Sequence, residues 1–271
     1  MSVSVNYCGG LGNQLFGIYA GMAYALENSK PFVVTKRDTS PGCTHRVTYF
    51  SSLLKHLPTV DHDPVSRSSI QEGTIFSYSP LPSREGNVVL NGYFQDHRYF
   101  ASRLEEINQY LRIPEQRNEV LQRVTRPNGP TIGLHFRLGD YKRLQHYHPL
   151  LPNEYYVKAL QDIHLALNGA VPTILVFCET EDAGEVESRV KQLLSFDEQW
   201  AARYQMMTHH DDVTQLFLMS ACDYLVIANS TFSWWAAAYA SSDTQVFVPH
   251  KWFHTPTPDG LVLKGWKKIE W

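Results

Sequence analysis

The chain has 271 residues, a length that fits one large domain or two domains of moderate size. Hydrophobic residues make up 43% and charged residues 19%, a balance that is typical of folded globular proteins and excludes a disordered chain. The net charge is −3, which argues against binding of nucleic acid or anionic lipid through a broad basic surface. An anionic ligand would have to be met by a few well-placed cations.

Apolar runs and cysteines bear on the compartment. No stretch approaches the roughly 20 apolar residues that a membrane-spanning helix needs, and the N-terminus shows no signal peptide. Four cysteines occur without CxxC spacing, and all except Cys43 lie in or beside apolar segments, namely Cys8, Cys178 and Cys222. We therefore expect buried thiols, no disulfide framework, no integral membrane segment and a cytoplasmic location.

The N-terminal half begins with the pattern of a strand, a glycine turn and a helix. Val3 and Val5 alternate with polar residues, and apolar side chains recur at helical spacing after residue 13. The predicted elements in chain order are a strand at 3–5, a helix at 13–26, strands at 32–34 and 88–90, and a helix that Asp96 caps and that extends to 111. Residues 36–86 have no clear period.

The clearest break in the chain is the Pro-Asn-Gly-Pro sequence at 127–130, which predicts domains at 1–128 and 129–271. Beyond it, strands and helices alternate. The predicted strands are 132–136, 173–178, 204–207, 225–228 and 245–248, and the predicted helices are 152–167, 183–194, 211–222 and 232–240. Five strands separated by helices predict a doubly wound parallel sheet, in which ligands bind beyond the carboxyl ends of the strands.

The first segment that could carry chemistry is the glycine turn at 9–12. Gly10 and Gly12 allow a backbone to approach a ligand closely, and the helix that follows offers free N–H donors. Leu15 stands where a dinucleotide fingerprint needs its third glycine. The side-chain amides of Asn13 and Gln14 suit a polyhydroxyl ligand, although a tight strand-to-helix turn explains the same residues.

The second segment follows the predicted strand at 132–136. Strand alternation places His135 and Arg137 on one face at its carboxyl end, and a guanidinium can grip a phosphate through two parallel hydrogen bonds. Asp140 lies three residues beyond Arg137 in the same turn. A plain Arg137–Asp140 ion pair is the alternative interpretation.

The third segment, Asn229 to Phe232, lies where a strand gives way to a helix. Ser230 and Thr231 are good N-cap residues, and their hydroxyls with the backbone at Phe232 could also seat a phosphate. Ordinary capping is the alternative. Glu179 follows one strand and Asp223 precedes another, and both carboxylates are candidates for contacts with guanine N–H groups or sugar hydroxyls.

These three segments together resemble the alpha-1,2-fucosyltransferases of glycosyltransferase family eleven. The carrying sequences are GGLGNQLFGIYA at 9–20, HFRLGDY at 135–141 and NSTFSWWAA at 229–237. Three departures are visible: Leu138 stands at the family's usual second Arg, Gly17 at its usual Gln and Ala236 at its usual Gly. The first of these leaves phosphate binding more dependent on Arg137 and on backbone donors.

The resemblance implies an α/β fold of two Rossmann-like domains of the glycosyltransferase B type with a cleft between them. It implies transfer of L-fucose from GDP-fucose to the 2-hydroxyl of a β-galactoside, with inversion and without a metal, in the synthesis of a polysaccharide or oligosaccharide. Arg137 would neutralise the departing diphosphate. Asp140, the carboxylate nearest to the expected leaving group, would hold Arg137 in place, with removal of the acceptor proton as the alternative role. Asn13 would orient the acceptor or the sugar. The expected donor contacts are Gly10, Gly12, Gln14, His135, Arg137, Glu179, Asp223, Asn229, Ser230, Thr231 and Phe232.

Other functions stay open at this point. The same donor could serve another sugar hydroxyl or a protein hydroxyl, and the fold could belong to a nonenzymatic nucleotide-sugar-binding protein. An NAD-dependent oxidoreductase would rest on Gly10 and Gly12 alone. The run from His209 to Asp212 has metal-binding residue types, but its place at a predicted helix start favours capping. We expect no metal and no other cofactor.

Overall fold

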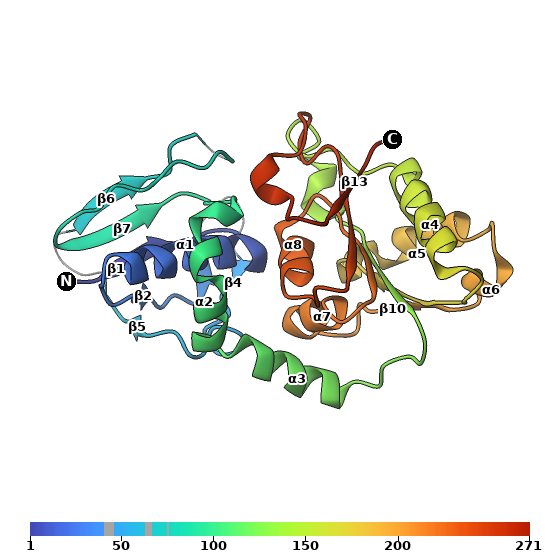
Figure 1. The fold of residues 1–271 in the computed structure, drawn as a ribbon, viewed down its shortest axis with the longest axis horizontal. Coiled ribbons are helices and arrows are strands. Elements are labelled where there is room, and N and C mark those ends of the chain that lie inside the picture. The colour runs from blue at the N-terminus through green and yellow to red at the C-terminus, as the bar shows by residue number, and fades with distance from the viewer. Residues whose placement is uncertain (41–45, 63–66, 75) are drawn as a thin grey trace. The chain divides into compact units, whose positions relative to one another are not determined.

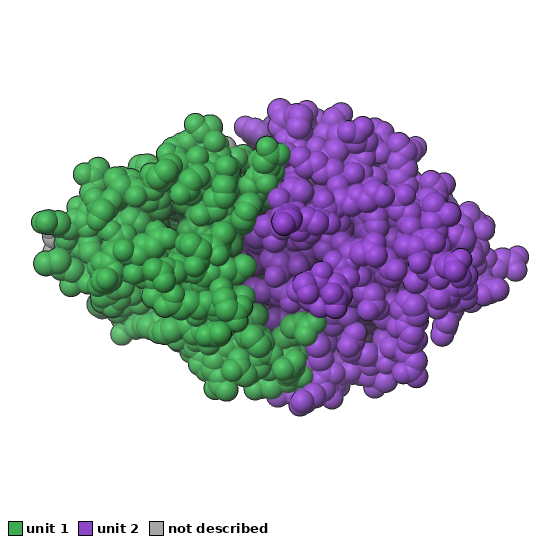
Figure 2. Space-filling model, in the orientation of Figure 1, with its two compact units in different colours: residues 1–119, 258–261 green, residues 120–257, 262–271 purple. Residues whose placement is uncertain are grey.

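The computed structural model describes residues 1–40, 46–62, 67–74 and 76–271, so Cys43 lies outside the described residues. These residues form two compact units, coloured separately in Figure 2. Unit 1 comprises Met1–Glu119 and Pro258–Leu261, and unit 2 comprises Val120–Thr257 and Val262–Trp271. Helix α3 (Ile113–Arg123) therefore begins in unit 1 and ends in unit 2, and the Pro-rich break at 127–130 follows it.

Unit 1 is built on a three-stranded parallel sheet in the order β1-β7-β6 (Figure 1). Its strands are β1 (Val3–Asn6), β7 (Asn87–Asn91) and β6 (Arg67–Gln71). Helix α1 (Leu11–Glu27) follows β1 directly, and most of its residues are buried, which explains its nearly continuous apolar sequence. All three strands end at one edge of this sheet, where the glycine turn begins.

The remainder of unit 1 consists of short elements. These are β2 (Val34–Thr35), β3 (Thr39–Ser40), β4 (Arg46–Val47), β5 (Thr59–Val60), η1 (His97–Tyr99), η2 (Ala101–Arg103), α2 (Leu104–Tyr110) and η5 (Asp259–Leu261). Asp96 is an N-cap residue as predicted, since its carboxylate accepts a hydrogen bond from the Arg98 N–H at the start of η1. The single helix predicted from there to residue 111 is instead divided into η1, η2 and α2. Phe100, with φ −140° and ψ 0°, is not helical and separates the short turns.

Unit 2 contains a six-stranded sheet in the order β10-β9-β8-β11-β12-β13, with every pair parallel. The strands are β8 (Thr131–His135), β9 (Thr173–Phe177), β10 (Tyr204–Met206), β11 (Tyr224–Val226), β12 (Gln245–Pro249) and β13 (Lys267–Ile269). The sequence predicted the first five of these. It missed β13, in which two lysines are exposed and Ile269 alone is buried.

Helices connect the strands of unit 2, and the pattern predicted each of them except the four-residue helix at Glu198–Ala201. They are α4 (Asn153–Leu167), α5 (Ala183–Leu193), α6 (Glu198–Ala201), α7 (Asp212–Met219) and α8 (Thr231–Ala238), with short turns η3 (Gly139–Lys142) and η4 (Thr180–Asp182). Trp234 and Trp235 of α8 are both buried. Among the described residues, no helix has the length and apolar character required to cross a membrane.

Two buried tyrosines at the start of α4 tie the ends of β8 and β11 and the middle of β12 to one helix. The Tyr156 hydroxyl donates to the His135 carbonyl at the end of β8, at 3.0 Å. The Tyr155 hydroxyl lies 2.6 Å from the Ile227 carbonyl after β11 and 3.0 Å from the Phe247 carbonyl of β12. These contacts hold the carboxyl ends of neighbouring strands in a fixed arrangement.

The strand order reverses between β8 and β11. From β8 the chain moves outward through β9 to β10, and then returns to the other side of β8 to continue through β11, β12 and β13. The loops that leave β8 and β11 therefore diverge at the carboxyl edge, which is the place where open α/β sheets bind ligands.

Candidate functional site

Arg137 is the charged centre of this edge. It follows β8, and its side chain is about one-fifth exposed. Its Nη2 donates to Oδ1 of Asp140 at 2.6 Å, and its Nη1 donates to Oε1 of Glu179, which follows β9. Burial opposes the charged guanidinium, but the two carboxylates outweigh it and raise the pKa of Arg137 above its usual value. The guanidinium is thus permanently charged and shared by two anions.

The turn that carries Asp140 is fixed from the neighbouring strand. Asp182 is buried, and its carboxylate accepts from the Gly139 N–H at 2.6 Å and from Lys142 Nζ at 2.7 Å. Gly139 has φ +30°, and a Cβ there would overlap the carboxylate of Glu179. Only glycine gives both this backbone conformation and room for Glu179.

Leu138 points away from this charged group. It is 2% exposed and belongs to the apolar cluster beneath the sheet edge, together with Phe136. The side chain at position 138 in this chain therefore packs in the core of unit 2.

His135, the last residue of β8, lies beside Arg137 in a dry environment. It is 5% exposed, and its ring centroid is 5.8 Å from that of Phe232 at the start of α8. Burial, reinforced by the positive charge of Arg137, lowers the pKa of His135 to about 3, so the imidazole is neutral at physiological pH. Its Nδ1 is buried and has no hydrogen-bond partner in the described structure. A buried ring nitrogen that has a fixed orientation and no protein partner can form a hydrogen bond with a ligand.

The N-terminus of α8 lies at the same edge. Ser230 is the N-cap residue, and its hydroxyl makes no capping hydrogen bond. Asn229 is fully buried, and its Nδ2 donates to the carbonyls of Pro149 and Trp252, which belong to two other loops. The segment predicted from the sequence therefore combines an anchor, Asn229, with backbone N–H groups at a helix start that can receive an anion.

Tyr141 connects the Arg137 turn to this helix start. Its hydroxyl donates to the Asn229 carbonyl at 3.0 Å, and the Arg137 guanidinium carbon lies 5.2 Å from the centre of its ring. The ring of His148 stacks on it with centroids 4.3 Å apart. Burial raises the pKa of Tyr141 to about 12, so the phenol stays neutral and serves as a packing and hydrogen-bonding group.

The glycine turn of unit 1 forms a separate polar group. Gly10 is the N-cap of α1, and Gly12 lies in the first turn of that helix. Gln14 is fully buried, and its amide donates to the carbonyls of Gly9 and Val47. Gln14 therefore supports the turn from inside, whereas Asn13 accepts a 3.0 Å hydrogen bond from Gln95 after β7.

Glu72, which follows β6, is a polar residue at the same edge of unit 1 that the sequence did not reveal. Its Oε2 accepts from the Tyr93 N–H at 2.6 Å, and a Cβ on Gly92 would overlap its side chain. Burial, with a smaller contribution from the charge of Asp96, raises the pKa of Glu72 although backbone N–H groups oppose the shift. The available signal was a carboxylate directly after a strand, but β6 itself was not predicted.

Asp223 lies away from the other predicted residues of unit 2. It precedes β11, so it lies at the amino edge of the sheet. Its Oδ2 accepts from both the N–H and the hydroxyl of Thr131, each at 2.8 Å, where β8 begins. This arrangement makes Asp223 a link between the starts of two strands. Our expectation that it reaches guanine or ribose is therefore not supported by its place in the fold.

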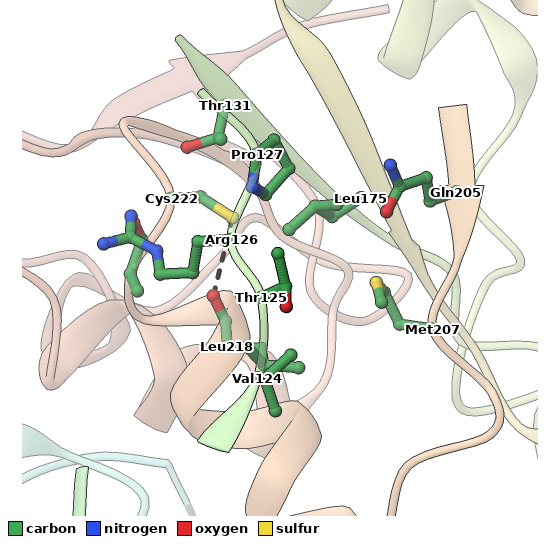
Figure 3. Close-up of a pocket in the computed structure, with 11 residues that line it drawn as sticks. Val124, Thr125, Arg126, Pro127, Thr131, Leu175, Gln205, Met207, Leu218 and Cys222 are labelled. Carbon is green, nitrogen blue, oxygen red and sulfur yellow. Dashed lines mark hydrogen bonds between the residues drawn. The ribbon is translucent and has the colours of Figure 1, made fainter. Parts of the chain in front are cut away.

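The pocket drawn in Figure 3 lies near Thr131 and contains none of the predicted site residues. Segment 124–127 lines it, together with apolar side chains of β9 and α7 and the thiol of Cys222. Burial raises the pKa of Cys222 to about 12, so this thiol is a poor nucleophile. The three described cysteines, Cys8, Cys178 and Cys222, form no disulfide with one another, and Cys8 is only partly buried.

The segment at 209–212, which has metal-binding residue types, contributes the N-cap residue of α7. The Asp211 carboxylate accepts from the N–H and the hydroxyl of Thr214, each at 2.9 Å. Within the described ranges, no group of three or more His, Cys, Asp and Glu side chains is arranged to hold a metal ion.

Comparisons with known proteins place this site in a family. The chain is 31% identical to the O-antigen biosynthesis glycosyltransferase WbnK of Escherichia coli, with 95% of this chain and 97% of that protein covered. It is 27% identical to an alpha-1,2-colitosyltransferase of Escherichia coli, over 63% of this chain and 58% of that protein.

Solved structures agree on the fold. The fucosyltransferase NodZ from Bradyrhizobium superposes with a TM-score of 0.54 at 11% identity, covering 88% of this chain and 93% of NodZ. The ADP-heptose heptosyltransferase II of Escherichia coli superposes with a TM-score of 0.53 at 10% identity, covering 99% and 90%. The predicted fold, two Rossmann-like units of the glycosyltransferase B type, is confirmed. The sequence profile of glycosyl transferase family 11 matches residues 69–271, and the chain belongs to this family.

Proposed function

We propose that this glycosyltransferase moves L-fucose from GDP-fucose to the 2-hydroxyl of a β-galactoside, with inversion and without a metal. The observation that carries the proposal is the convergence of three features at the switch point of unit 2. The unpartnered Nδ1 of the neutral His135 belongs to the last residue of β8, and Arg137 and the N-terminus of α8 follow the carboxyl ends of β8 and β11. A guanidinium, a hydrogen-bonding ring nitrogen and free N–H groups at a helix start are groups that can bind a sugar diphosphate.

The proposed step is a single displacement. An acceptor oxygen attacks the anomeric carbon of fucose from the face opposite the diphosphate, and the bond between that carbon and the β-phosphate oxygen breaks with its electron pair on GDP. Arg137 and the N–H groups of α8 offset the charge that develops on the leaving oxygen. The acceptor proton passes to the departing phosphate, because a transition state with strong cationic character on the sugar needs little help from a base.

A second candidate differs in the sugar alone. The relative at 27% identity is named an alpha-1,2-colitosyltransferase, so colitose, a sugar closely related to fucose, is the alternative transferred group. The α-1,2 linkage is common to that name and to our first candidate. The relative at 31% identity acts in O-antigen biosynthesis, which makes a bacterial surface polysaccharide repeat the natural class of acceptor.

The decisive experiment supplies purified protein with GDP-fucose and lactose, and measures released GDP and the trisaccharide. We expect GDP in proportion to the trisaccharide and, by NMR, an α-1,2 linkage to galactose. Parallel reactions replace the donor with the GDP-activated form of colitose. A preference for that donor would favour the second candidate.

Other outcomes would identify the remaining alternatives. GDP release without lactose fucosylation, but with fucosylation of another glycan or a peptide, would keep the donor and replace the acceptor. Binding of GDP-fucose without turnover on any acceptor would indicate a nonenzymatic binding protein. Absence of GDP binding combined with NAD-dependent oxidation would contradict the proposal completely.

A further inference from the structure

The charge balance around Arg137 is unfavourable for an anionic ligand. One guanidinium faces the two carboxylates of Asp140 and Glu179, so the group has a net negative charge. His135 adds none, because its imidazole is neutral. Lys142 is paired with Asp182 and Glu185, each at 2.7 Å. If this arrangement did not change, the two carboxylates would repel an approaching diphosphate while the guanidinium attracted it.

The hydrogen-bonding pattern points the same way. Both terminal nitrogens of Arg137 donate to carboxylates, Nη1 to Glu179 and Nη2 to Asp140. A two-bond grip on a phosphate uses two N–H groups on one edge of the guanidinium, and each such edge includes at least one of these nitrogens. Each terminal nitrogen carries two N–H groups, so a phosphate held in this way shares at least one nitrogen with a carboxylate and lies beside its negative charge.

The two carboxylates differ in how firmly they are held. Asp140 belongs to the same short turn as Arg137, and the Gly139 N–H fixes this turn to the buried Asp182. Glu179 comes from the turn after the neighbouring strand on a side chain one methylene longer, and it lies over Gly139, where a Cβ is absent. The two carboxylate side chains are about equally exposed, at 31% for Asp140 and 33% for Glu179. The longer side chain makes Glu179 the carboxylate that can leave Arg137 without moving the turn that carries Asp140.

We propose that Glu179 occupies the place of the donor diphosphate on Arg137 in the empty protein and is displaced when the diphosphate binds. Asp140 stays on Nη2 and keeps the guanidinium oriented, so Glu179 is a positioning residue that exchanges with the ligand. This inference rests on the proposed function in one respect, the binding of a guanosine diphosphate sugar at this edge. It changes the expectation for Glu179 from a contact with guanine or ribose to competition with phosphate.

The test is a comparison of guanosine, GMP and GDP as ligands of Glu179→Gln, by isothermal titration calorimetry. The Gln amide oxygen can still accept from Nη1, but the negative charge is gone. We expect the variant to bind GDP about tenfold more tightly than the wild type, from the loss of one repulsive charge a few ångströms away. Guanosine should bind equally to both proteins, because it has no phosphate.

Two further variants guard against indirect effects. Glu181→Gln removes the same charge from an exposed neighbouring position and should leave the affinity for GDP within about twofold of the wild type. Glu179→Ala should increase the affinity for GDP as Glu179→Gln does. Thermal unfolding measurements show whether either variant has lost its fold.

The outcomes separate this inference from the proposed function. Unchanged or weaker GDP binding by folded Glu179→Gln, with the wild type binding GDP, would overturn the inference alone. Equal weakening for guanosine, GMP and GDP would also overturn it and would assign Glu179 to the nucleoside. If the wild type bound no guanine nucleotide, the proposed function would fail and the inference with it.

Discussion

Arg137 does two things that a lysine could not do at this position. Its planar guanidinium spans Asp140 and Glu179 through different nitrogens, and it stays charged although it is largely buried. An ammonium is a point charge without this fork, so it cannot keep the orientation that two parallel bonds to phosphate require.

We therefore expect Arg137→Lys to lower kcat/KM for GDP-fucose and lactose by at least ~100-fold, which corresponds to about 3 kcal/mol of transition-state stabilisation. Steady-state kinetics checks this, with circular dichroism to confirm folding. Turnover near that of the wild type would remove Arg137 from the proposed leaving-group role.

Asp140 is expected to position Arg137 and not to act as a base, because its Oδ1 already accepts a 2.6 Å hydrogen bond from the guanidinium. Asp140→Asn should reduce both donor hydrolysis without acceptor and transfer with lactose, by similar factors. Free fucose and trisaccharide are measured side by side. Transfer lost with hydrolysis intact would assign Asp140 to proton removal.

The strands of unit 2 explain why Asp223 cannot join the site. In a parallel sheet, residues before a strand lie at the amino edge and residues after a strand lie at the carboxyl edge. Asp223 accepts two hydrogen bonds from Thr131 at the amino edge, so it fastens the start of β8 to the start of β11.

Asp223→Ala should lower the free energy of unfolding by roughly 1–3 kcal/mol, because the buried Thr131 loses its charged acceptor. The affinity for GDP should not change. Urea unfolding and calorimetry make the two measurements on one preparation. Weakened GDP binding with unaltered stability would return Asp223 to the nucleotide site.

Glu72, at the end of β6, gives unit 1 a pH-dependent contribution to stability. Because burial raises its pKa in the folded state, folding favours the protonated form. The stabilising contribution is complete below the usual pKa of a glutamate and is lost as pH rises through the raised value.

Glu72→Gln, which resembles the protonated acid, should therefore gain stability relative to the wild type between about pH 4 and pH 7. Urea unfolding at several pH values measures the difference. The exposed Glu85→Gln is the control and should show no such trend. A constant difference across this range, or one of opposite sign, would contradict the assignment.

Much of unit 2 was predictable, because its buried strands are short apolar runs between helical patterns. Strands β6 and β13 were not, since only Ile70 and Ile269 are buried in them and their identity depends on pairing with distant partners. The turn with Arg137 and Asp140 was visible in the sequence. The contact with Glu179 needed the strand order, because only the sheet shows that β9 adjoins β8. The place of Asp223 could have been predicted from the sequence, because a residue that precedes a parallel strand lies at the amino edge of the sheet and not at the carboxyl edge.

For the protein as a whole, the proposed chemistry depends on a guanidinium and a helix start where other transferases use a divalent cation. We expect full transfer activity after exhaustive treatment with EDTA, measured as GDP release with GDP-fucose and lactose. A reproducible loss restored by Mn²⁺ would contradict this and would direct attention to His209, His210 and Asp212.

The two tyrosines of α4 have a consequence for ligand affinity. Their hydroxyls bind backbone carbonyls at the end of β8, just beyond β11 and within β12, so the loops after β8 and β11 share one anchor. Because those loops are already ordered, a ligand that binds at this edge does not have to order them. The conformational entropy lost on binding is then mainly that of the side chains that rearrange. Backbone amide exchange at Phe136 and Asn229 should consequently be slow before any nucleotide is added, and the largest change on binding should be confined to the Arg137 turn.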